Sequence, residues 1–216
     1  MNLSRRQNTK LVIFDFDGTI ADTSEGIIDA HRFTLKAMER KCPSDYELRK
    51  VIGRNLFQTY MDTFGFDETE AKKAVKIYRN RYAGVGIHKA TVYQGCEDLL
   101  MYLKGSGISI GVATLKAEIF TEVMLEELNI ADFFDEICGM DPSDSEDKTS
   151  LILKCIEKNG CIKDRAVLVG DSINDLTGAK EAGIRFVGVT YGFGFVPNIL
   201  YEFDTIDKPM DLQLFL

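Results

Sequence analysis

The stretch LVIFDFDGT at residues 11–19 places four apolar residues directly before two aspartates that a single phenylalanine separates. A continuous apolar run of this length is typical of a strand covered on both faces, as in a parallel sheet with helices above and below. Alternate residues that leave a strand can point the same way, so we expect Asp15 and Asp17 to lie close together. Two close carboxylates at a buried strand end repel each other, which indicates a bound cation or a shared proton.

Further apolar runs of strand length alternate with helical patterns along the rest of the chain. The runs lie at residues 108–113, 166–169 and 186–189. Apolar residues at helical spacing occupy residues 97–104, 118–128, 149–158 and 176–182. This alternation is typical of an α/β fold, and it predicts a doubly wound, Rossmann-like parallel sheet.

The stretch from Thr23 to Gly86 has a different pattern, without a convincing strand. Ser44 and Glu47 have the spacing of a capping box, which predicts a helix that ends at Gly53. Apolar residues at helical spacing predict three more helices, at residues 24–40, 56–64 and 69–82. We therefore expect an α-helical cap domain at residues 21–87, inserted into an α/β core formed by residues 1–20 and 88–216.

The composition is that of an acidic globular protein. Of the 216 residues, 26 are Lys or Arg and 34 are Asp or Glu, so the formal net charge is −8. This length suits one domain, or one domain with an insert. Such a chain lacks the positive field that captures nucleic acid, so no nucleic acid polymer is expected as a partner. An anionic substrate would need a metal or a few placed cations to neutralise its charge.

The cysteines and the apolar runs bear on the compartment in which the protein works. Five widely spaced cysteines without a C-x-x-C pair favour free thiols in a reducing compartment over disulfides or a zinc site. No apolar run approaches the roughly 18 residues of a membrane span. The stretch after Arg5 and Arg6 is too short for a secretion signal, so we read a solvated basic tail. We expect a cytoplasmic protein with no membrane partner, as a monomer or a homodimer.

Ligands of open α/β sheets bind beyond the carboxyl ends of the strands, so the residues that follow each strand are candidates for a site. They are Asp15 and Asp17, then Thr114 and Lys116, then Asp171, Ser172 and Asp175, with Lys148 at the start of a helix. Carboxylates, a hydroxyl and an ammonium group would converge at one edge of the sheet.

Most of these residues also have a purely structural interpretation. Asp171 or Ser172 can cap the next helix, Asp175 suits its positive first turn, Thr114 can cap a helix, and Lys148 can be surface charge. The glycines of residues 191–194 do not open a helix after a strand, which favours a loop over a dinucleotide site. A lone histidine is more often structural than functional, and neither histidine is given a role.

Four stretches resemble, in order and rough spacing, the motifs of the haloacid dehalogenase superfamily of phosphatases and phosphotransferases. They are DFDGT at residues 15–19, Ala113-Thr114, Lys148, and GDSIND at residues 170–175. Residues 178–194 are similar to the corresponding stretch of phosphoglycolate phosphatases. These enzymes belong to subfamily I of the superfamily, whose members have a helical cap. The chain departs from that pattern at Leu115, where a small polar residue is common, and at Thr149, where proline is common.

The resemblance implies a role for each matching residue. Asp15 would be the nucleophile that forms an aspartyl-phosphate, while Asp17 would protonate the leaving oxygen and then deprotonate the attacking water. Thr114 and Lys148 would act in catalysis and, together with Gly18 and Leu115, would bind the phosphoryl group. The implied cofactor is Mg²⁺, with ligands from Asp15, the backbone carbonyl of Asp17, Asp171 and Asp175.

These roles predict a phosphoric monoester hydrolase, a Mg²⁺-dependent phosphatase that acts on a small phosphorylated metabolite as phosphoglycolate phosphatases do. True dehalogenases of the superfamily lack an aspartate at the position of Asp17. A phosphomutase, a pyrophosphatase and a 5'-nucleotidase stay open as alternatives. A receiver-like signalling protein and a catalytically silent binding protein fit less well, because of the helical insert and the complete motifs. Arg54 either contacts a second anionic group of the substrate or is a solvated arginine.

Overall fold

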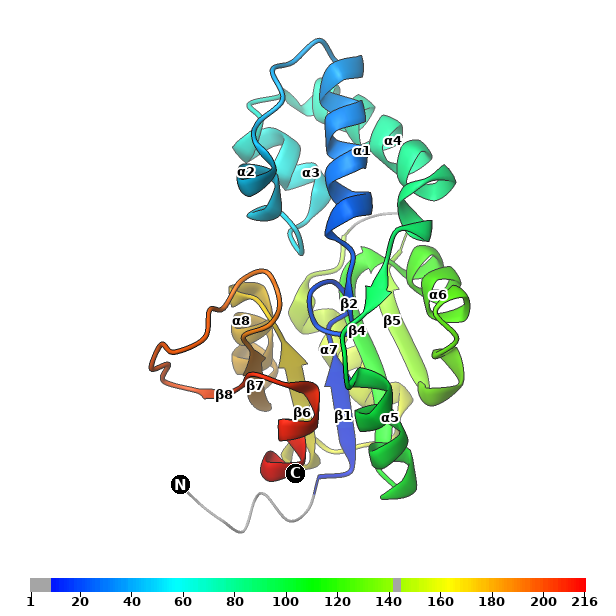
Figure 1. The fold of residues 1–216 in the computed structure, drawn as a ribbon, viewed down its shortest axis with the longest axis vertical. Helices are drawn as coiled ribbons and strands as arrows, with labels where there is room; N and C mark the ends of the chain where they lie inside the picture. The colour runs from blue at the N-terminus through cyan, green and yellow to red at the C-terminus, as the bar shows by residue number, and fades with distance from the viewer. Residues whose placement is uncertain (1–8, 142–144) are drawn as a thin grey trace.

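The computed structural model describes residues 9–141 and 145–216, so Arg5 and Arg6 lie outside the described residues. Six strands form one sheet in the order β5–β4–β1–β6–β7–β8, and every neighbouring pair is parallel (Figure 1). The strands are β1 (Leu11–Phe14), β4 (Ser109–Ala117), β5 (Glu136–Met140), β6 (Ala166–Gly170), β7 (Arg185–Val189) and β8 (Asp204–Ile206). The predicted α/β fold with a parallel sheet is confirmed.

Strand β1 lies at the centre of the sheet, and its four residues are at most 1% exposed. Leu11 and Ile13 pack on one face with the buried residues of α7 (Lys148–Lys158) and α8 (Ile173–Ala182). Val12 and Phe14 belong to the core on the other face, with α5 (Cys96–Gly105) and α6 (Glu118–Glu127). Burial on both faces explains why the strand contains only apolar residues.

The segment between β2 and β3 is helical and lies above the carboxyl ends of the strands (Figure 1). It contains α1 (Ser24–Ala37), α2 (Asp45–Arg49), α3 (Leu56–Gln58), a π-helical turn (Thr59–Thr63), α4 (Glu68–Gly84) and a 3₁₀ turn (Gly86–His88). We call residues 24–88 the helical segment. No helix within the described residues is both long enough and apolar enough to cross a membrane.

The predicted helices of this segment are present, with different ends. The capping box of Ser44 and Glu47 is confirmed, since the backbone N–H of each residue donates to the side chain of the other residue. Helix α2 nevertheless ends at Arg49, before the predicted Gly53. Val51 and Ile52 are buried in the turn that follows, and Gly53 takes a positive φ of 77° there. The first predicted helix likewise ends at Ala37 rather than at residue 40.

Several short elements escape the sequence patterns. Strands β5 and β8 form the two edges of the sheet, where one neighbour is missing and polar residues are tolerated. Strands β2 (Ala21–Asp22) and β3 (Thr91–Val92) pair antiparallel, which brings together the two connections to the helical segment. The remaining 3₁₀ turns lie at Ala131–Phe133, Lys163–Arg165 and Pro209–Phe215.

Candidate active site

Asp15 and Asp17 follow β1 and are both buried, at 5% and 6% exposure. The backbone N–H of Asp15 donates to the carbonyl of Val169 at 2.9 Å, so the pairing of β1 with β6 extends to this aspartate. The carboxylate of Asp15 is thereby fixed at the carboxyl edge of the sheet. This is the edge at which the strand pattern predicts a site.

Three carboxylates meet at this edge, two from the ends of β1 and β6 and one from the first turn of α8. Oxygen atoms of Asp15, Asp171 and Asp175 lie within 4.8 Å of one another, and all three residues are buried. Burial raises the pKa of Asp15 and of Asp171 above the usual range for a carboxyl, and repulsion from Asp175 adds to both shifts. Hard oxygen donors under mutual repulsion are a suitable set of ligands for a divalent cation such as Mg²⁺.

Lys148 is the first residue of α7 and supplies the positive charge next to this cluster. Its Nζ lies 2.6 Å from Asp15 Oδ1 and 2.7 Å from Asp175 Oδ1. Burial alone would lower the pKa of Lys148, but the two carboxylates outweigh burial and raise it. The surface-charge interpretation of Lys148 is therefore wrong, because the side chain is only 6% exposed. One lysine does not neutralise three carboxylates, which leaves room for a second cation.

Asp171 and Asp175 are positioned by the chain around α8. The predicted cap at Ser172 is confirmed, because Ser172 and Asp175 form a capping box at the start of α8. The backbone N–H of Phe193 donates to Asp171 Oδ2 at 2.6 Å from the loop after β7. The glycine-containing stretch at residues 191–194 is a loop, as expected, and its contact with Asp171 was not predicted.

Asp17 is held by two polar partners on its other side. Thr23 Oγ1 donates to Asp17 Oδ1 at 2.7 Å, and Lys116 Nζ lies 3.0 Å from the same oxygen. Lys116 Nζ also donates to the hydroxyl of Tyr82 on α4 at 2.9 Å, so it links the helical segment to Asp17. Sequence reasoning did not assign Lys116 a role, although it lies two residues beyond Thr114 on β4.

Thr114 and Leu115 line the space between the helical segment and the sheet, and Gly18 lies beside Asp171. Thr114 is 1% exposed and lies within the irregular stretch between Ala113 and Ala117 where the register of β4 with β5 shifts. The N-cap of α6 is Ala117, so the capping interpretation of Thr114 is wrong. Its hydroxyl instead accepts a bond from the backbone N–H of Lys116 at 3.3 Å. Gly18 has a φ of 85°, and a Cβ there would lie 2.3 Å from Asp171 Oδ2.

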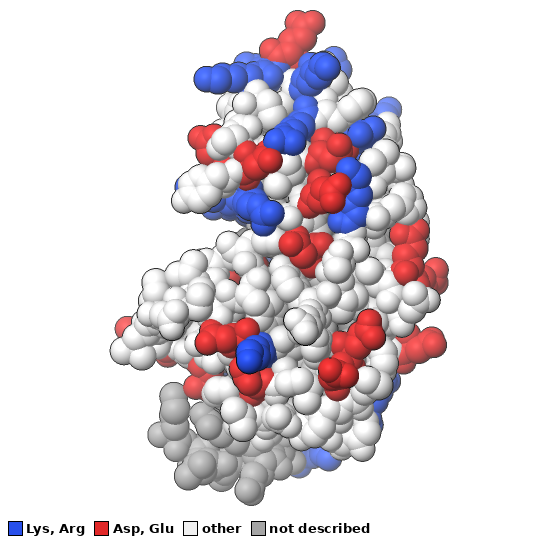
Figure 2. All heavy atoms as spheres, viewed as in Figure 1, with Lys and Arg blue, Asp and Glu red and all other residues white. Residues whose placement is uncertain are grey.

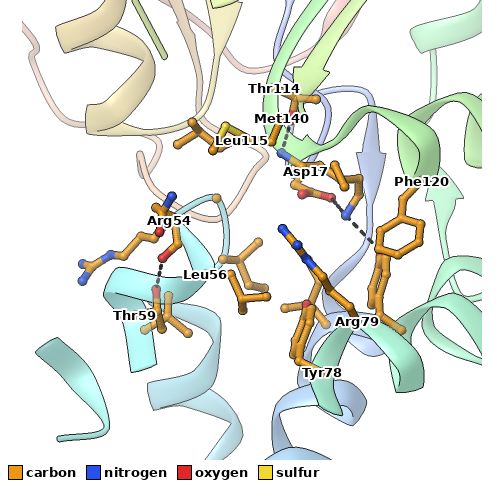
Figure 3. Close-up of a pocket in the computed structure, with 18 of the residues that line it drawn as sticks. Asp17, Arg54, Leu56, Thr59, Tyr78, Arg79, Thr114, Leu115, Phe120 and Met140 are labelled. Carbon is orange, nitrogen blue, oxygen red and sulfur yellow. Dashed lines mark hydrogen bonds and ion pairs between the residues drawn. The ribbon is translucent and has the colours of Figure 1, made fainter. Parts of the chain in front are cut away.

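A small cavity and a larger cleft separate the helical segment from the sheet. The cavity, which we call the inner cavity, holds about 70 Å³ and is lined by Asp17, Thr114, Lys116, Tyr82 and other residues (Figure 3). The cleft holds about 610 Å³ and extends to Asp171. Figure 2 shows Lys and Arg side chains above the hollow, and Arg49, Lys50 and Arg54 line the cleft.

Arg54 borders both spaces and is exposed. In Figure 3 its guanidinium points away from Asp17. The loop that carries it is fixed to helix α8 by Asn174 Nδ2, which donates to the carbonyl of Gly53 at 3.1 Å. The structure therefore places Arg54 at the boundary of the cavity, apart from the carboxylates.

His31 lines the inner cavity from α1, where it is 2% exposed. Its Nδ1 lies 3.2 Å from the hydroxyl of Tyr60, and its ring contacts Tyr78 at 4.7 Å between centroids. Burial lowers the pKa of His31 from 6.5 to about 3. The imidazole is therefore neutral at physiological pH, which supports a structural role.

The His31→Gln variant is expected to lose less stability in acid than the wild type. The unfolded chain binds a proton at His31 below about pH 6.5, whereas the folded chain does not until about pH 3. Between these limits, each unit by which the pH falls therefore lowers the free energy of unfolding of the wild type by about 1.4 kcal/mol more than that of the variant. Urea unfolding at pH 7, 6, 5 and 4 measures both slopes, and parallel curves would refute the prediction.

Comparisons with known proteins agree on one family. The model of the haloacid dehalogenase-like hydrolases matches residues 12–189. A 5'-nucleotidase from Pseudomonas aeruginosa is 34% identical over 184 residues, which cover 85% of this chain and 83% of that protein. A phosphoglycolate phosphatase from Agrobacterium fabrum is 30% identical over 214 residues, which cover 94% of this chain and 90% of that protein. The crystal structure of a predicted phosphatase from Clostridium acetobutylicum matches with a TM-score of 0.89 at 30% identity. The match covers 96% of this chain and 97% of that one.

Proposed function

Because the chain belongs to the haloacid dehalogenase-like hydrolase family and is a phosphatase, we propose that it uses Mg²⁺ and an aspartyl-phosphate at Asp15 to hydrolyse a small phosphorylated metabolite. The observation that carries this proposal is the buried cluster of Asp15, Asp171 and Asp175, with Lys148 paired to it and Asp17 nearby. In this proposal residues 21–87 are the cap, and residues 1–20 with 88–216 are the core. The five free cysteines favour a reducing, cytoplasmic location.

The proposed reaction has two steps, each with a defined proton transfer. A carboxylate oxygen of Asp15 attacks phosphorus, the bond to the leaving oxygen breaks, and Asp17 donates a proton to that oxygen. Asp17 then accepts a proton from water, the water oxygen attacks phosphorus, and inorganic phosphate leaves with Asp15 restored. Because Asp17 acts as acid and then as base, it ends in its starting state.

The remaining residues of the site bind charge. Asp15, Asp171 and the backbone carbonyl of Asp17 would hold Mg²⁺, with Asp175 beside them. When bound, Mg²⁺ reduces the repulsion between the carboxylates and the phosphoryl group. Lys148 stabilises the negative charge on Asp15 and on the phosphoryl oxygens. Thr114, with the backbone at Gly18 and Leu115, orients those oxygens, a contribution that dominates in phosphoryl transfer.

A 5'-nucleotidase activity is the second candidate, because the relative with that name is 34% identical to this chain. A nucleoside exceeds the inner cavity of about 70 Å³, but it would fit the cleft of about 610 Å³ beside Asp171. The basic residues Arg49 and Lys50 on the wall of that cleft are compatible with an anionic nucleotide. The size of the leaving group therefore distinguishes a phosphatase for small metabolites from a 5'-nucleotidase.

Phosphate release from a panel of phosphorylated metabolites tests the proposed function. The panel includes phosphoglycolate, a sugar phosphate, adenosine monophosphate and pyrophosphate, each with Mg²⁺ and with a chelator. We expect turnover of at least one monoester, and we expect the chelator to abolish it. Turnover that persists in the chelator would contradict the metal requirement, and no turnover of any compound would contradict a general phosphatase.

The Gly18→Ala variant is expected to bind Mg²⁺ at least about tenfold more weakly than the wild type, because its methyl group displaces Asp171. Gly65→Ala is the matched control, since Gly65 has a similar positive φ of 68° and open space around it. Both variants incur backbone strain of about 1 kcal/mol. Titration of Mg²⁺ by calorimetry measures the difference, and equal affinities of the two variants would refute the prediction.

A further inference from the structure

The loop that follows β7 contacts Asp171 at two points, and we call residues 191–195 the β7 loop. The backbone N–H of Phe193 donates to Asp171 Oδ2 at 2.6 Å. The backbone N–H of Phe195 donates to the carbonyl oxygen of Asp171 at 3.0 Å. One loop therefore holds both the carboxylate and the main chain of a residue that belongs to the carboxylate cluster. Partners of this kind orient a metal ligand without touching the metal.

Two glycines allow the β7 loop to approach Asp171 so closely. A Cβ at Gly192 would lie 2.3 Å from the carbonyl oxygen of Gly18 and 2.6 Å from Asp171 Oδ2. A Cβ at Gly194 would lie 2.4 Å from the carbonyl oxygen of Asp171. Real Cβ atoms do not make contacts this short. A side chain at either position would therefore push the β7 loop away from Asp171.

The two carboxylate oxygens of Asp171 have different surroundings. Oδ2 accepts the bond from Phe193, and an N–H donor at 2.6 Å from a charged oxygen forms a short, strong bond. The same oxygen lies against the backbone at Gly18 and Gly192, since a Cβ at these positions would lie 2.3 and 2.6 Å from it. Oδ2 is therefore enclosed by backbone, and Oδ1 is the oxygen that remains for a cation.

The β7 loop is anchored on both sides of the bond to Asp171. The hydroxyl of Tyr191 donates to the carbonyl oxygen of Thr19 at 3.2 Å, within the DFDGT stretch. Phe195 is 4% exposed, and its ring lies 6.1 Å from that of Phe186 and 5.0 Å from that of Phe203 between centroids. These anchors keep the N–H of Phe193 in place, so the carboxylate of Asp171 keeps its orientation.

The number of oxygens that a carboxylate offers bears on which cation it binds. Mg²⁺ requires a nearly ideal octahedron of oxygens and retains several waters. Ca²⁺ takes about six to eight oxygens in a flexible arrangement and accepts both oxygens of one carboxylate. A carboxylate with one oxygen bonded to the backbone therefore suits Mg²⁺ better than Ca²⁺.

We propose that the β7 loop is a positioning element that presents Asp171 to the metal through Oδ1 alone and thereby favours Mg²⁺ over Ca²⁺. This inference rests on the Mg²⁺ requirement of the proposed function. It goes beyond that requirement, because it assigns part of the choice of cation to backbone donors outside the set of ligands. The β7 loop acts through Asp171 and touches no reacting atom.

The Gly194→Ala variant tests this role, because its Cβ would meet the main chain of Asp171 and Ser172 rather than the carboxylate. Displacement of the β7 loop should release Oδ2. We expect Mg²⁺ to bind about tenfold more weakly than to the wild type, as is usual when the partner of a ligand is lost. The affinity for Ca²⁺ should change by no more than a few-fold, because Oδ2 becomes a further oxygen for the larger cation. Calorimetric titration of the metal-free protein with each chloride salt measures both dissociation constants.

Two further variants complete the test. Gly105→Ala is the matched control, since Gly105 ends α5, lacks a positive φ and has open space around it. This control should keep both affinities. Phe195→Leu shortens an anchor of the β7 loop and adds no atom near Asp171, so it serves if Gly194→Ala does not fold. It should shift the ratio of the two dissociation constants in the same direction by a few-fold. Melting curves in a chelator verify that each variant is folded.

The ratio of the dissociation constants for Mg²⁺ and Ca²⁺ decides the outcome. A folded Gly194→Ala or Phe195→Leu variant with an unchanged ratio, whether both affinities fall equally or neither falls, would overturn the proposal. A protein that shows the expected shift but hydrolyses no phosphate ester would contradict the proposed function and leave this inference standing. A wild type that binds no Mg²⁺ would overturn both.

Discussion

The Asp15→Asn variant is expected to release phosphate at least about 10⁴-fold more slowly than the wild type, at saturating Mg²⁺ and substrate. The amide has nearly the shape of the carboxylate, but it does not form a bond to phosphorus under these conditions. Lys148 keeps Asp175 as a partner at 2.7 Å, so the fold should persist. Steady-state release of phosphate from p-nitrophenyl phosphate measures the effect.

Two controls separate loss of chemistry from loss of structure. Asp132→Asn, at an exposed aspartate in the turn that precedes the amino end of β5, should retain wild-type activity. The melting temperature of Asp15→Asn should stay within a few degrees of the wild type, because the change removes one of three repelling carboxylates. A variant that keeps more than about a tenth of the wild-type rate would exclude Asp15 as the nucleophile.

The Lys148→Met variant is expected to lose both stability and activity. The side chain is only 6% exposed and pairs with Asp15 and Asp175, so its removal leaves carboxylates buried together without a cation. Breaking such a buried pair costs about 3 kcal/mol in the free energy of unfolding. The rate should fall by about 10³-fold, since a charge next to the reacting group is lost.

Urea unfolding in a chelator and phosphate release with Mg²⁺ measure these two effects. Lys154→Met is the matched control on the same helix, because Lys154 is half-buried and its carboxylate neighbours lie at 3.5 and 3.9 Å. We expect this control to change stability by less than about 1 kcal/mol. Similar losses in the two variants would show that Lys148 has no special relation to the carboxylates.

The centre of the fold could be predicted because its residues carry a local signal. Strand β1 is buried on both faces, so its four apolar residues stand out from the charged residues that follow. The helical segment shows its periodicity because each helix buries one face. Edge strands β5 and β8 give no such signal, since they mix polar and apolar residues and are paired on one side only.

The site was predictable only in part, for a related physical reason. The carboxylates and Lys148 follow strands or begin helices, so topology alone brings them to one edge. Lys116 meets Asp17 across the neighbouring strands β4 and β1. Tyr82 and Arg79 reach the same space only through the packing of α4 above the sheet, a long-range arrangement that no local stretch encodes. The position of Lys116 two residues after Thr114 on one strand was the available signal, because such residues share a face.

Trapping a phosphoryl group on Asp15 tests the central claim most directly. In Asp17→Asn, p-nitrophenyl phosphate should still transfer its phosphoryl group, because nitrophenolate leaves without a proton, while hydrolysis of the intermediate should lack its base. We predict a burst of nearly one equivalent of nitrophenolate in the presence of Mg²⁺, and a phosphoryl group on the acid-quenched peptide that contains Asp15. Continuous release of nitrophenolate by this variant, with Asp15 unmodified throughout, would contradict the account.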